Sequence, residues 1–139
     1  MKTMMMAAVC FLGFAADAVV SQSAKAVPLG LWQATLDGMP GVTLTLANDA
    51  GELGGTVVFY GIDGHSQRVM VVEPHTVLRP HMEGNTLLFE MKMDRVPGGF
   101  ARVKVVFDSE TKAEIKCLDC GADSPTAELV KQTGQLQRQ

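Results

Sequence analysis

Basic clusters and long amphipathic segments are both missing from the body of this chain. Its 139 residues hold 12 Lys and Arg against 15 Asp and Glu, which gives a net charge of −3. Because a nucleic-acid-binding surface needs clustered positive charge, we expect no nucleic-acid partner. After residue 26 no apolar run approaches the roughly 20 residues that a membrane-spanning helix needs, so we also expect no membrane span.

Motifs of the common enzyme classes are missing as well. No G-x-S-x-G sequence occurs, and the neighbours Asp63, His65 and Ser66 cannot form a catalytic relay, because such a relay is assembled from separated segments. The candidate metal ligands are Asp63, His65, Glu73, His75 and His81, and each histidine lies beside Gly or Pro in a predicted loop. Their spacings match no compact zinc motif, so we interpret the histidines as solvated loop residues. We therefore expect a non-enzymatic protein without metal or cofactor.

The first 26 residues have the layout of a secretory signal peptide. Lys2 precedes an apolar run over residues 4–16, and the small-residue patterns A-D-A and A-K-A end at Ala18 and Ala26. A basic start, a short apolar run and an A-x-A site are typical of a cleaved export signal. We expect cleavage after Ala26, with Ala18 as the alternative, and a secreted or periplasmic location.

Short runs of alternating apolar and polar residues, separated by Gly-, Pro- and Asn-rich turns, fill residues 27–131. In residues 42–46 Val and Leu alternate with Thr, and in residues 101–107 Val alternates with Arg and Lys. A period of two predicts strands with one buried face. About eight or nine such strands predict an all-β domain, a small antiparallel up-and-down β-barrel or alternatively a β-sandwich. Residues 132–139 read as a polar tail.

The inward positions of these strands predict the interior of the barrel. Six residues are candidates to line it: Trp32, Phe89, Met91, Val103, Val105 and Phe107. A barrel of about eight strands either fills its interior with side chains or holds one small ligand. A filled barrel and a barrel with a ligand cavity show the same alternation of apolar and polar residues, so both alternatives remain open. Pro74 and Pro80 predict a bent edge, because proline cannot donate a backbone hydrogen bond to a neighbouring strand.

Most of residues 27–131 resembles a group of small secreted bacterial domains with lipocalin-like β-barrels. The resemblance is carried by a tryptophan in the first strand, an L-x-L strand and a G-x-L-x-G-T hairpin: Trp32, Leu44, Leu46, Gly51, Leu53, Gly55 and Thr56. It implies a lipocalin-like fold and brings no catalytic residues with it. The C-L-D-C segment at residues 117–120 departs from the pattern.

Cys117 and Cys120 are the only cysteines after residue 26. In an exported protein two neighbouring cysteines are expected to form a disulfide. A redox-active C-x-x-C usually opens a helix that lowers the thiol pKa, and turn residues follow Cys120 instead. A zinc site needs about four ligands, and no second pair is present. We favour a structural disulfide over redox or metal chemistry.

The segments 56–60 and 68–72 are apolar at successive positions, unlike strands that face water on one side. Regular pairing would place Val57, Phe59, Met70 and Val72 on one face of a hairpin. Because exposed apolar patches mark interaction sites, we predict a surface for self-association or for a protein partner. The alternative is a bulge or register shift that buries both faces locally.

These observations favour a secreted binding module for a small apolar ligand or a partner protein. The first alternative is a structural or interaction protein of the cell envelope that uses the apolar hairpin at residues 56–72. The second alternative is a thiol–disulfide redox protein that uses Cys117 and Cys120.

Overall fold

The computed structural model describes residues 28–36, 38–122 and 124–133 of the chain. The predicted signal peptide and residues 134–139 of the predicted tail lie outside the described residues. Nine strands run through the described part: β1 (Gly30–Leu36), β2 (Met39–Asp49), β3 (Glu52–Asp63), β4 (Arg68–Thr76), β5 (Leu78–Glu83), β6 (Thr86–Lys92), β7 (Phe100–Phe107), β8 (Lys112–Cys117) and β9 (Ala127–Lys131). This part contains no helix, and so none with the length and apolar character required to cross a membrane.

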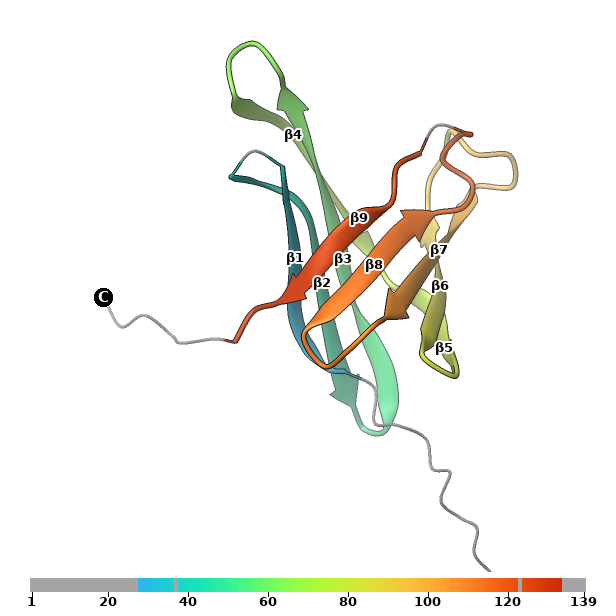
Figure 1. Cartoon of the computed structure of the whole chain (residues 1–139). Coiled ribbons are helices and arrows are strands. Elements are labelled where there is room, and N and C mark those ends of the chain that lie inside the picture. Colours follow the sequence, from blue (N-terminus) through green and yellow to red (C-terminus); the bar gives the residue numbers. More distant parts are fainter. Residues whose placement is uncertain (1–27, 37, 123, 134–139) are drawn as a thin grey trace, which may run out of the picture.

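All nine strands belong to one antiparallel sheet with the order β4-β3-β2-β1-β9-β8-β7-β6-β5. The sheet curls into a nearly closed barrel (Figure 1). The predicted all-β antiparallel barrel is confirmed, and its hairpins are those of an up-and-down meander. The meander departs from the simplest order at one place, because β4 and β5 follow each other without pairing. Instead β1 pairs with β9, so that the two ends of the chain's β-region meet in the middle of the sheet.

The seam of the barrel therefore lies between β4 and β5. The chain bends at Val77, which is buried and donates its backbone N–H to the Gly55 carbonyl on β3 at 2.9 Å. Pro74 and Pro80 lie on the two strands that border the seam, as their missing N–H groups require. The prediction that His75 and His81 lie in loops is wrong, because they lie within β4 and β5. The end of the seam away from this bend is splayed, and the β3–β4 hairpin rises above it (Figure 1).

The core follows the alternation of the strands. In β8 every second residue is buried, and β7 follows the same pattern over most of its length. The fully buried side chains include Trp32, Leu44, Leu46, Leu87, Met91, Leu129, Val57, Val103 and Val105. The Trp32 ring packs edge-to-face against Phe107, with 5.2 Å between ring centroids, and its indole N–H donates to the Pro28 carbonyl at 3.1 Å. A satisfied indole N–H is what allows tryptophan to occupy the core.

The predicted apolar face of the β3–β4 hairpin, which grouped Val57, Phe59, Met70 and Val72, is wrong. Val57 is fully buried and Phe59 half-buried, so both point into the barrel. Val72 lies opposite Tyr60, on the other side of the sheet, and a register shift at Gly61 leaves Met70 without a partner on β3. Because a one-residue slip reverses the side-chain direction, the shift separates residues that regular pairing would group. Val57 is therefore not part of any accessible surface.

Candidate functional site

A cavity of about 450 Å³ lies at the splayed end of the barrel. Its floor is formed by apolar side chains from five strands, which include Ala34, Val42, Phe59, Met91 and Ile115. Met93, just beyond β6, extends this apolar floor. These positions belong to the inward set of their strands, and the same alternation that builds the core also makes the floor. The cavity is therefore continuous with the core and not a groove on the outer surface.

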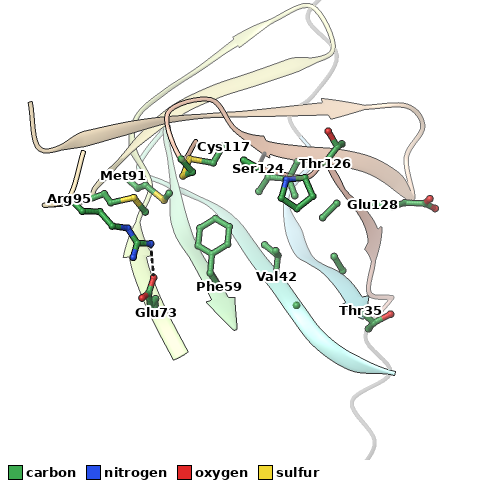
Figure 2. A pocket seen from close by; sticks show the side chains of 17 residues that line it. Thr35, Val42, Phe59, Glu73, Met91, Arg95, Cys117, Ser124, Thr126 and Glu128 are labelled. Carbon is green, nitrogen blue, oxygen red and sulfur yellow. Dashed lines mark ion pairs between the residues drawn. A yellow bond between two sulfur atoms is a disulfide. The ribbon is translucent and has the colours of Figure 1, made fainter. Parts of the chain in front are cut away.

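The rim of the cavity is polar and crosses the seam. Glu73 of β4 lies opposite Phe59 of β3, so its carboxylate is directed toward the cavity. Arg95, in the loop after β6, forms an ion pair with Glu73 across 3.7 Å (Figure 2). Both side chains remain substantially exposed, and an ion pair of this length and exposure contributes little to stability. The Arg95–Glu73 ion pair therefore spans the splayed end but does little to hold it closed.

The opposite wall is the loop between β8 and β9. Cys117 and Cys120 are joined by a disulfide, with their Cα atoms 5.5 Å apart, and both line the cavity. The predicted disulfide is thus present. Cys117 is buried and Cys120 exposed, so the bridge runs from the core to the rim. Residues 124–128, which follow the disulfide, complete this wall.

Asp119 fixes the disulfide loop to β7. Its carboxylate accepts the Arg102 backbone N–H at 2.8 Å and two guanidinium N–H groups at 2.9 and 2.8 Å. The Leu118 N–H in turn donates to the Arg102 carbonyl at 2.8 Å. The guanidinium bonds, followed by the backbone bond, lower the pKa of Asp119 to about 2. Its negative charge is therefore paired with Arg102, and no helix follows Cys120 in the described residues to activate a thiol.

All six predicted lining residues belong to the hydrophobic core, and two of them also border open space. Met91 lines the cavity. Trp32, Phe89, Val103 and Val105 are packed in the hydrophobic core. Phe107 is also in the core and borders a second, more polar hollow of about 620 Å³ at the other end of the barrel. Within the described residues, side chains thus fill much of the barrel interior, and the two hollows lie toward its ends.

The scattered polar candidates are not brought together. Asp63 closes the β3–β4 turn by accepting the His65 backbone N–H at 2.9 Å and the Ser66 hydroxyl at 3.0 Å, and these bonds lower its pKa. The His65 ring takes no part in these contacts. In the described ranges, no three His, Cys, Asp or Glu side chains gather into a group that could hold a metal ion.

His75 is distinct among the histidines. Its Nε2 atom is buried and has no hydrogen-bond partner within the described residues. Its ring packs edge-to-face against Phe59, with 6.1 Å between ring centroids, and Phe59 lines the cavity. A buried polar atom without a partner lowers stability, and here it lies directly behind a wall of the cavity.

Sequence reasoning did not find Arg95, Glu73 or the 124–128 wall as parts of one site. The glycine-rich turn after Arg95 and the proline at position 125 indicated only loops. One signal was available for Glu73, which is a single charge after four apolar residues in β4. The direction of the Glu73 side chain could not be predicted from the sequence, because it depends on the register shift at Gly61.

Comparison of the chain with protein-family models, with curated proteins and with solved structures gives no match.

Proposed function

We propose that this protein binds a small apolar ligand in the cavity at the splayed end of the barrel. The observation that carries the proposal is the position of the cavity: about 450 Å³ of space with an apolar floor lies where the seam is open. Binding sites for small molecules have volumes of about 300–1,000 Å³, mostly apolar walls and a few polar groups that fix orientation. The proposed ligand would replace water that the apolar floor cannot hydrogen-bond.

The polar groups support a ligand with one polar end. Glu73 and Arg95 lie at the rim of the cavity, whereas Phe59, Met91 and Met93 provide its apolar lining. Methionine side chains adapt to ligands of different shape because they are unbranched and flexible. Breaking the long Arg95–Glu73 ion pair costs little free energy. Ligand entry along the seam therefore need not disturb the paired strands. A secreted binding module, as expected from the sequence, would act in this way.

The experiment is a titration with 8-anilinonaphthalene-1-sulfonate, a fluorescent probe with an apolar ring system. Ala127 is half-buried at the cavity wall, and Ala127→Phe places an aromatic ring in the space. Ala47→Phe is the matched control, because Ala47 is exposed on β2 and does not line the cavity. We expect saturable enhancement of probe fluorescence with wild-type protein and with Ala47→Phe. We expect Ala127→Phe to weaken probe binding about tenfold or more, because the ring occupies the same volume.

Native mass spectrometry of the freshly purified wild-type protein gives an independent readout, since a retained apolar molecule appears as added mass that is lost on denaturation. Equal probe affinity in the wild-type, Ala127→Phe and Ala47→Phe proteins would place the probe elsewhere and contradict the proposal. Near-ultraviolet circular dichroism of both variants establishes that a loss of binding does not reflect loss of the fold.

A further inference from the structure

The β4 strand exposes four consecutive apolar side chains. The exposed fractions are 38% for Val69, 64% for Met70, 48% for Val71 and 55% for Val72. Strand β4 is also the end strand of the sheet and, among the described strands, pairs only with β3, so one of its edges has backbone groups without a strand partner there. Unpaired edges of this kind are templates for pairing with another strand.

The sheet has two end strands, and they differ in their protection. Strand β5, at the other end of the sheet, carries Arg79, Pro80, His81 and Glu83 within six residues. Arg79 has a φ of 49° and marks an irregularity in the pairing with β6. Charges, proline and bulges are the devices that prevent edge pairing. Residues 69–72 of β4 have neither charge nor proline and one irregularity, at Met70, so of the two end strands in the described residues β4 presents the more apolar edge for pairing.

We propose that β4 pairs antiparallel with β4 of a second copy of this chain. The charges at the two ends of the exposed run favour this occupant: Arg68 precedes it and Glu73 follows it. Antiparallel pairing about a two-fold axis brings the Arg68 end of each strand beside the Glu73 end of the other. Glu73 keeps 41% of its side chain exposed while it contacts Arg95, so it can also meet this partner charge. Pairing covers the apolar run and satisfies the free edge in one contact.

The first test is sedimentation equilibrium of the full chain over a range of concentrations. We expect a reversible equilibrium between one and two chains. The double substitution Met70→Lys and Val72→Lys places two charges in the pairing strand and is expected to raise the dimer dissociation constant about tenfold or more. Val130→Lys is the matched control, because Val130 is 42% exposed but lies on β9, a strand with partners on both sides. Val130→Lys is expected to leave the dissociation constant unchanged.

The second test uses the end charges. Arg68→Glu alone and Glu73→Lys alone each place like charges at both ends of the homodimer, and like charges across a pair of strands are destabilising. In a mixture of the two variants, the heterodimer has opposite charges at both ends. Native mass spectrometry is therefore expected to show weakened homodimers and a restored heterodimer.

A wild-type chain that sediments as a monomer at every concentration would overturn the inference. A mixture of the two charge variants that forms no heterodimer would also overturn it. The same holds for a Val130→Lys effect as large as that of the β4 double substitution, because that result would indicate nonspecific hydrophobic association. A stable complex in which β4 pairs with a different protein would assign the edge to that partner and equally overturn self-pairing. The outcomes of the first test are independent of probe binding in the cavity, since Met70 and Val72 do not line it, whereas Glu73 of the second test does.

Discussion

Gly55 and Gly54 are neighbours on β3 with opposite steric surroundings, and replacing each with alanine tests the packing of β2 on β3. An added Cβ at Gly55 would lie 1.9 Å from the Thr45 carbonyl oxygen and 3.3 Å from the Leu46 Cα atom. At Gly54 an added Cβ meets nothing within 4 Å. Gly55 also accepts the Val77 N–H that ties β5 to β3, so the substitution strains the bend that closes the barrel.

The expected magnitudes follow from these contacts. A Cβ needs a separation above 3 Å, so Gly55→Ala must move the backbones of β2 and β3 apart by more than 1 Å. Overpacking typically lowers the free energy of unfolding by about 1–3 kcal/mol, and both crowded groups here are backbone atoms that cannot rotate away. We expect a loss of about 3 kcal/mol for Gly55→Ala. Gly54→Ala is expected to raise stability by about 0.4–1 kcal/mol through the reduced entropy of the unfolded chain.

Urea unfolding followed by the fluorescence of Trp32, the only tryptophan, measures both variants. Thermal unfolding gives a second readout, in which a loss of about 3 kcal/mol lowers Tm by roughly 12–20 °C for a domain of this size. If Gly55→Ala unfolds within about 0.5 kcal/mol of the wild type, the close approach of β2 and β3 at Thr45 is wrong. A large loss in Gly54→Ala would show that glycine is needed in this hairpin for a reason other than the contact with Thr45.

Three further predictions concern the loop, the disulfide and a half-buried histidine. Because Arg102 holds the pKa of Asp119 at about 2, below its ordinary value of 3.8, the stability it provides is present above pH 4 and is lost as pH falls toward 2. Thermal unfolding of Asp119→Asn should therefore show a deficit at pH 7 that disappears near pH 2, and a constant deficit would contradict the carboxylate's role. Replacing Cys117 and Cys120 together with alanine should lower the free energy of unfolding by about 2 kcal/mol in urea titrations and remove any effect of reductant; a reductant effect that persists would point to another cause. His75→Leu removes the buried Nε2 atom that lacks a described partner and should raise the free energy of unfolding by about 1 kcal/mol, whereas a loss of 1 kcal/mol or more would indicate that this atom is hydrogen-bonded.

Several features of the fold were predictable because they are local. Alternation in residues 42–46 and 101–107 predicted strands within β2 and β7 with the correct buried faces, since a strand with one covered side must repeat every two residues. Pro74 and Pro80 predicted the edge of the sheet for the same local reason, the missing N–H. The disulfide was predictable from two cysteines three residues apart.

Other features depend on contacts between distant segments. The register shift at Gly61 decides that Glu73 turns toward the cavity while Val72 turns away, and no local pattern in β4 marks it. Arg95 meets Glu73 only because the barrel brings the loop after β6 to the seam. The pairing of β1 with β9 leaves the seam between β4 and β5, although the chain order favours pairing of consecutive strands.

The sequence by itself thus determined the class of the fold, the positions of the strands and most of the core, because burial of alternate residues is imposed strand by strand. Only the tertiary structure decided which inward residues pack together and which border open space. Met91 and Phe89 have the same alternation in β6, but Met91 lies where the seam is splayed and Phe89 where the barrel is filled. That difference arises from the closure of the whole sheet, which fixes the distance between strands far apart in the chain.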